Sequence, residues 1–152
     1  MFSGYWDMSY FHESGGFVKA LLNDWSVSWI TSLPTGQPYS QLVTNDLNGD
    51  GNRSNDIVPG SRNVERLPTQ YLVDLRLQRR LSLSKQVKLD LIAEAFNLLN
   101  STNISNQQRT LYNLTGGVLV PQQNLSNPRL NFGADSAALD ARALQLAAKL
   151  TF

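Results

Sequence analysis

The clearest pattern in the chain is an alternation of apolar and polar residues over positions 71–100, which read YLVDLRLQRRLSLSKQVKLDLIAEAFNLLN. In the first half every second residue is apolar, and Arg79 is the one exception. The second half, from Val87 onward, repeats the alternation. A period of two indicates a β-strand with two different faces. The stretch therefore predicts a β-hairpin whose arms are longer than the usual strand of about five or six residues.

The charges of this hairpin predict its register. A loop over residues 84–86 places Arg76 opposite Glu94 and Arg80 opposite Asp90, which are two pairs of opposite charge. A slip by two residues would bring like charges together, which destabilises a strand pair. One face of the hairpin is therefore expected to be apolar, and the other to carry a ladder of charges formed by Asp74, Arg76, Arg80, Asp90 and Glu94. We interpret these charges first as structural partners and second as part of a substrate path.

Similar alternation recurs along the chain and predicts an all-β antiparallel meander of about five amphipathic strands. The expected strands lie near residues 1–11, 24–35, 69–83, 87–100 and 140–152. A short helical turn is expected near 17–23, and long polar loops near 36–68 and 101–140. The connections therefore alternate between short and long.

Two environments suit such strands. A soluble sandwich would bury the apolar face against a second sheet, whereas a membrane barrel would turn that face to lipid. The tryptophans at 25 and 29 then belong either to a core or to an interfacial aromatic girdle. Each arm reaches the roughly 9 to 11 residues that a tilted membrane strand needs, and outer-membrane barrels have short internal turns and long external loops. Both features favour transmembrane strands, in which Arg79 would snorkel to the interface near the inner turn.

The first long loop contains an incomplete calcium-loop motif, DLNGDGNRSND, over residues 46–56. Oxygen ligands at the first, third and fifth positions and the following glycine match the motif, but position twelve is Ile57 instead of a carboxylate. An EF-hand is thus excluded. Two interpretations remain, an oxygen cage for calcium and a surface loop built from Asx turns. The candidate ligands of the cage are Asp46, Asn48, Asp50, Asn52 and Asp56.

Composition excludes several functions. A net charge of +1 without a basic cluster gives no nucleic-acid footprint, and the absence of cysteine excludes disulfides and thiolate metal sites. The sole histidine, His12, has no nucleophile beside it, so we do not expect an enzyme. The first residues lack the basic start and apolar core of a signal peptide.

Several motifs resemble the carboxy-terminal part of TonB-dependent receptors. The alternating last strand ends in phenylalanine and is similar to the signal by which bacterial outer-membrane barrels are recognised for assembly, here carried by Leu146, Leu150 and Phe152. Other motifs follow in the order typical of the Oar-like group, which contains a carboxypeptidase regulatory domain. They are WSVSWITSLPTGQPY at 25–39, the run at 46–56, Pro59-Gly60, Arg62-Asn63 and EAFNLLN at 94–100.

The resemblance implies a fragment, residues 1–152, of a barrel of about 22 strands in the bacterial outer membrane. Such receptors take up large ligands with energy supplied through TonB, and the plug domain and signal peptide are not in this sequence. The implied partners are outer-membrane lipid, the rest of the barrel and plug, the barrel-assembly machinery, and the TonB complex through the missing amino-terminal part. The alternative is a soluble all-β module that binds a partner in the presence of calcium.

Overall fold

The computed structural model describes residues 1–10, 16 and 22–152, and its secondary structure is almost entirely β. The strands are β1 (Phe2–Met8), β2 (Trp25–Ser32), β3 (Pro38–Tyr39), β4 (Leu42–Val43), β5 (Glu65–Arg66), β6 (Leu72–Ser82), β7 (Lys88–Phe96), β8 (Ile104–Gln107), β9 (Thr110–Thr115), β10 (Val118–Pro121), β11 (Asp135–Ala138) and β12 (Ala143–Thr151). A single 3-10 turn, η1, covers Pro128–Leu130. His12 and most of the helical turn expected near 17–23 lie outside the described residues.

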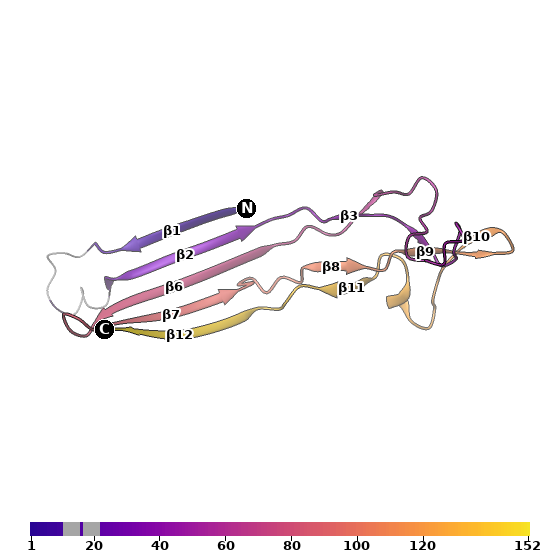
Figure 1. The fold of residues 1–152 in the computed structure, drawn as a ribbon. Coiled ribbons are helices and arrows are strands. Elements are labelled where there is room, and N and C mark those ends of the chain that lie inside the picture. The colour runs from indigo at the N-terminus through magenta and orange to yellow at the C-terminus, as the bar shows by residue number, and fades with distance from the viewer. Residues whose placement is uncertain (11–15, 17–21) are drawn as a thin grey trace. The chain divides into compact units, whose positions relative to one another are not determined.

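The chain forms two compact units. The first unit comprises Met1–Leu33, Tyr71–Ser101 and Asp140–Phe152. Its strands form one antiparallel sheet in the order β1-β2-β6-β7-β12, so each strand pairs with the next one along the chain that belongs to this sheet (Figure 1). The all-β, antiparallel architecture expected from the alternation is thus confirmed, with five long strands at the expected places.

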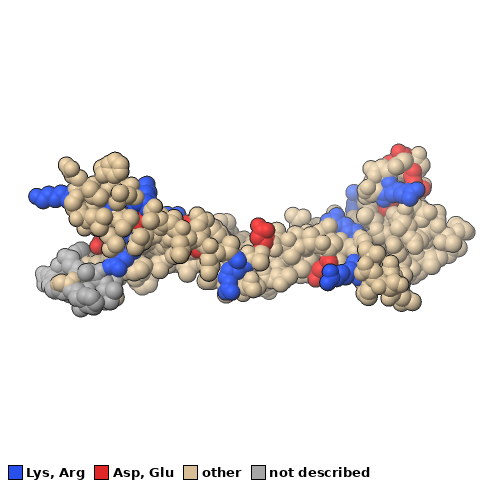
Figure 2. Space-filling model, turned by 90° about the horizontal axis from the view of Figure 1, so that it is seen from below, with Lys and Arg blue, Asp and Glu red and all other residues tan. Residues whose placement is uncertain are grey.

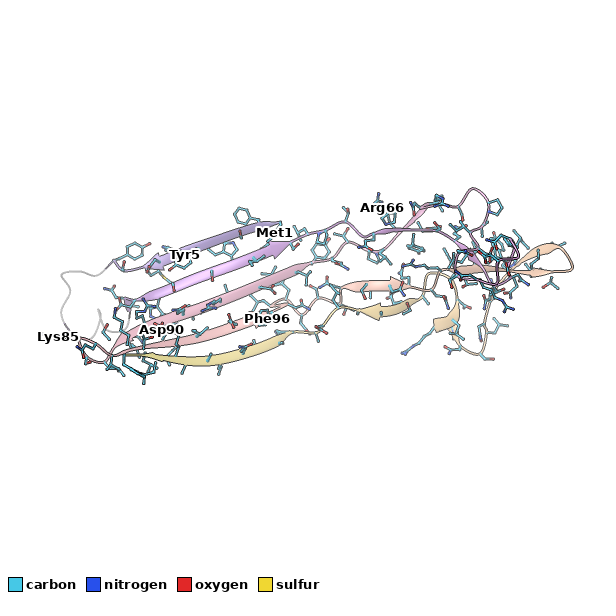
Figure 3. The ribbon with its side chains drawn as sticks, in the orientation of Figure 1. Met1, Tyr5, Arg66, Lys85, Asp90 and Phe96 are labelled. Atoms are coloured by element: carbon cyan, nitrogen blue, oxygen red, sulfur yellow. The ribbon has the colours of Figure 1, made fainter. Side chains whose placement is uncertain are left out.

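The central hairpin of this sheet, β6–β7, has the register that the charges predicted. Leu75 lies opposite Ala95, and the same register runs to Ser82 opposite Lys88. The N–H of Leu83 donates to the carbonyl of Val87 across the turn, at 3.0 Å. Lys85 marks this turn in Figure 3, and Phe96 marks the opposite end of β7. Because β12 pairs with β7 antiparallel, the carboxy terminus lies at the turn end of the sheet (Figure 1).

The second unit comprises Pro34–Gln70 and Thr102–Leu139, the two segments expected to be long loops. Both contain short strands that the sequence did not predict. They form three small sheets, with the orders β10-β9-β4, β11-β8 and β3-β5. Most pairs are antiparallel, but β4 and β9 pair in parallel. These segments therefore fold together as a structured unit.

In the part of the chain that the structure describes, the buried apolar residues all lie in the second unit. They are Tyr39, Val43, Leu67 and Ile104. A close backbone approach supports this small core at Gly36, where a Cβ atom would lie 1.7 Å from the carbonyl oxygen of Leu67. Among the described residues of the first unit, no apolar side chain is buried. The long sheet thus has no hydrophobic core of its own.

Candidate functional site

The long sheet separates its side chains into two chemically different faces. Register and alternation place the following residues on one face, here called the apolar face: Phe2, Gly4, Trp6, Met8, Trp25, Val27, Trp29, Thr31, Val73, Leu75, Leu77, Arg79, Leu81, Leu89, Leu91, Ala93, Ala95, Leu144, Leu146, Ala148 and Leu150. The opposite face, here called the polar face, carries most of the charged and hydroxyl groups of the sheet. Strict alternation along every strand produces this separation.

Among the described residues of the first unit, no second layer of protein packs on the apolar face. Trp6 is 51% exposed, Leu146 is 84% exposed, and every residue of β12 is exposed. Moving one large apolar side chain out of water stabilises a protein by about 1.5–3 kcal/mol. A sheet that leaves a whole face of such side chains in water forgoes this gain at each position. The face therefore requires an apolar environment.

The polar face holds the two ion pairs that the sequence predicted. The guanidinium of Arg76 donates to Glu94 Oε1 at 2.9 Å. Arg80 binds Asp90 with two hydrogen bonds, of 2.7 and 3.0 Å. The Asp90 side chain is largely buried, but the two arginine side chains are 44% and 55% exposed. Ion pairs that water reaches in this way are worth only up to about 1 kcal/mol each, whereas like charges opposite one another would oppose pairing. The pairs therefore act mainly by selecting the register.

Asp74, the remaining member of the predicted charge ladder, has a different role. Its Oδ1 accepts the backbone N–H of Asn97 at 2.9 Å and forms no ion pair among the described residues. Asn97 is 3% exposed and has a φ of +49°, a left-handed conformation that asparagine tolerates better than most residues. Asp74 thus supports the turn that ends β7.

Asn97 organises this turn through its side-chain amide. Its Nδ2 donates to the carbonyls of Ser101 (3.0 Å) and Asp140 (3.2 Å), and its Oδ1 accepts the N–H of Ser101 at 3.0 Å. The Oδ1 of Asn100 also accepts a hydrogen bond from the backbone N–H of Arg142. The sequence analysis assigned no role to these residues. The signal available was the pair of asparagines just after a strand, because asparagine favours turns with positive φ.

Hydrogen bonds between its own residues hold the calcium-like run at 46–56 together. Asp46 accepts the N–H groups of Gly49 and Gly51, both at 2.7 Å, and Asn48 accepts that of Asp50 at 2.9 Å. Asn52 likewise accepts the N–H of Ser54 at 3.0 Å. These are the Asx turns of the second interpretation.

The carboxylates of this run at positions 50 and 56 have separate surroundings. A hydrogen bond from the Asn55 amide and another from the Asn52 N–H hold the pKa of Asp50 below its ordinary value. Asp56 is 4% exposed, and its Oδ1 accepts the N–H of Leu47 while its Oδ2 has no hydrogen-bond partner. Within the described part of the chain, no group of three or more His, Cys, Asp or Glu side chains lies together in a geometry that could hold a metal ion.

The second unit also contains a polar hollow of about 360 Å³. Tyr39 and Arg109 line it, and the Arg109 Cζ lies 5.7 Å from the centroid of the Tyr39 ring. Burial, followed by the charge of Glu65, raises the pKa of Tyr39 above its ordinary value. The phenol is therefore neutral at physiological pH and donates to Gln107 Oε1 at 3.2 Å.

The three residues of the expected assembly signal lie at the edge strand β12 and just beyond it. Leu146 and Leu150 belong to the apolar face, and Phe152 follows the strand with 92% of its surface exposed. All three side chains are exposed in the described structure.

The charged groups on one face of the molecule are mixed in sign (Figure 2). Lysine, arginine, aspartate and glutamate are scattered over the face seen in Figure 2, and no extended patch of one sign is visible there. No helix among the described residues has the length and apolarity to cross a membrane.

Comparisons with family models, curated proteins and solved structures found no match to the chain.

Proposed function

We propose that the chain is part of the wall of an outer-membrane β-barrel, namely the carboxy-terminal part of a TonB-dependent receptor of the Oar-like group. The observation that supports this most strongly is the five-stranded sheet with one continuous, uncovered apolar face. Lipid supplies the apolar environment that this face requires, and the polar face with its ion pairs then lines a wet lumen.

The connections between the strands also support this proposal. The short turn at 84–86 and the carboxy terminus lie at one end of the sheet. Both long segments, 34–70 and 102–139, leave from the other end, because they follow β2 and β7. Outer-membrane barrels have short turns inside and long loops outside. In this arrangement the second unit faces the exterior, where it meets ligand.

The proposed role concerns a parent receptor. Five strands leave two open edges, β1 and β12, and do not enclose a lumen. The remaining strands of the barrel would pair with these edges, and the plug domain would contact the polar face. The assembly machinery would recognise Leu146, Leu150 and Phe152. Energy-coupled uptake of a large ligand is then the function of the complete receptor, to which this chain contributes wall and external loops.

The alternative, a soluble module that depends on calcium, has less support. It would bury the apolar faces on each other, but the described residues of the first unit form one sheet with no second layer on it. It would also use the run at 46–56 as a calcium site, whereas the oxygens of Asp46 and Asn48 already accept backbone N–H groups.

Spin labels along β6 would test the proposal. The chain has no cysteine, so single cysteines at Val73, Asp74, Leu75, Gln78 and, as a loop control, Arg53 can each carry one nitroxide. In lipid vesicles we expect labels at 73 and 75 to collide mainly with oxygen, which partitions into lipid. Labels at 53, 74 and 78 should collide mainly with a water-soluble nickel complex. Equal access of the nickel complex to all five sites would contradict a lipid-facing surface.

A further inference from the structure

Arg79 is the one charged side chain among the described residues of the apolar face. Arg79 of β6 is paired with Trp25 of β2 and with Leu91 of β7, and Leu77 and Leu81 are its neighbours on the same face of its own strand. Arginine is always charged in proteins and carries five N–H donors. A guanidinium among such neighbours therefore needs a partner.

The described residues provide only some of the interactions that the Arg79 guanidinium needs. The Arg79 Cζ lies 5.2 Å from the centroid of the Trp25 ring, which is a cation–π contact. Its Nε is buried and makes no hydrogen bond. By contrast, Arg76 and Arg80 on the polar face each bind a carboxylate. Among the described residues, no carboxylate forms an ion pair with Arg79.

A hollow of about 500 Å³ lies beside this arginine, and it is lined mainly by apolar side chains. Besides Trp25 and Arg79 its lining includes Leu91, Ala93 and Ala148. The two alanines are small among leucines, and a groove therefore forms where they lie. Its volume falls in the usual range of ligand pockets, about 300–1,000 Å³. A ligand that fits both features has an apolar chain and an anionic group.

The position of Arg79 along the sheet narrows the choice of ligand. Trp25 is the first residue of β2, so Arg79 lies level with the start of that strand and toward the turn at 84–86. In the proposed barrel this is the inner end of the sheet, where tryptophans and long basic side chains meet the lipid headgroups. An anionic group at that depth is the phosphate of an inner-leaflet phospholipid.

We propose that Arg79 and Trp25 form a binding site for an anionic glycerophospholipid. The guanidinium binds the headgroup phosphate, which in an anionic lipid is not neutralised by an ammonium group of the same headgroup as it is in phosphatidylcholine. The indole ring holds the guanidinium in place, and an acyl chain lies in the groove over Ala93 and Ala148. This site rests on the proposed function, because it requires the apolar face to be in a bilayer.

The test measures which lipid lies next to Trp25. Trp6→Phe and Trp29→Phe leave it as the only tryptophan of the full chain. The chain is reconstituted in two kinds of phosphatidylcholine vesicle. One contains a small fraction of phosphatidylglycerol with brominated acyl chains, and the other contains the same fraction of phosphatidylcholine with brominated acyl chains. Bromine quenches tryptophan fluorescence at short range. We expect about fivefold enrichment of brominated phosphatidylglycerol over phosphatidylcholine, as one basic residue gives at an anionic membrane surface.

Three variants separate this site from a general attraction to anionic lipid. Arg79→Leu should remove the enrichment without harming insertion, because leucine suits the apolar face. Arg79→Lys should keep part of the enrichment, because it keeps the charge. Arg76→Gln removes a positive charge from the polar face and should leave the enrichment unchanged.

The outcomes also separate this site from the proposed function. Equal quenching by the two brominated lipids, or enrichment that survives Arg79→Leu, overturns the lipid site and leaves the barrel wall intact. Absence of quenching by both lipids, together with quenching by aqueous iodide, shows that the apolar face is not in the bilayer and overturns both.

Discussion

Placing an arginine at Leu75 would test the orientation of the sheet and its depth in the membrane together. Leu75 lies on the apolar face within β6, opposite Trp29 and Ala95. In a transmembrane barrel an arginine costs about 2–4 kcal/mol at the bilayer midplane and about 0–1 kcal/mol near an interface. Leu83 is the matched control, because it continues the alternation of the same strand but lies at the inner turn and is 59% exposed.

We expect Leu75→Arg to lower the free energy of unfolding in lipid vesicles by about 2–4 kcal/mol, and Leu83→Arg by no more than about 1 kcal/mol. Denaturant titration followed by tryptophan fluorescence would measure both values. The penalty at Leu75 should also grow in bilayers of longer acyl chains, because the arginine then lies farther from water. Equal losses at the two positions, or a Leu75 penalty that does not depend on bilayer thickness, would refute the assignment of this face to lipid.

Three further predictions concern turns and loops. Asn97→Ala should lower the free energy of unfolding by about 2–4 kcal/mol, because it removes three side-chain hydrogen bonds and places alanine at positive φ. Asn97→Gly should lose about 1 kcal/mol less, because glycine adopts positive φ without strain. Equal losses for the two variants in the same denaturant titration would contradict the role of φ. The Asp50 carboxyl should titrate by NMR below 3.8, and Asn55→Ala should raise its pKa, since the Asn55 amide is the main cause of the shift. Because the folded pKa is depressed, the contribution of Asp50 to stability is present at neutral pH and is lost as pH falls below 3.8 toward that pKa. Gly36→Ala should destabilise the second unit by about 1–3 kcal/mol through the clash with the Leu67 carbonyl, and amide exchange at Leu67 that stays as slow as in the parent chain would contradict this.

The sequence predicted the long sheet well because its pattern and its charges are local signals. A period of two marks the faces, and the pairs Arg76–Glu94 and Arg80–Asp90 select one register among those that the turn allows. These features depend on residues within a few positions of one another or on a short turn. Such features can be read without knowledge of the rest of the chain.

The second unit could not be predicted in the same way. Its strands are two to six residues long, and β4 pairs with β9, which begins more than sixty residues later. Strands this short carry no period, and their pairing depends on distant contacts. Asp74 lies on the polar face with the other charges of the predicted ladder, but its hydrogen-bond partner could not be predicted. That partner is the N–H of Asn97, a backbone group that no sequence pattern marks.

The most direct measurement of the central proposal is refolding in two solvents. The full chain is dissolved in denaturant and diluted either into buffer or into detergent micelles, with β-structure followed by circular dichroism and size by light scattering. Our account predicts ordered β-structure only in micelles and aggregation in buffer, since the apolar face needs cover. A compact, ordered monomer in buffer that calcium stabilises further would contradict the barrel wall and support the soluble module.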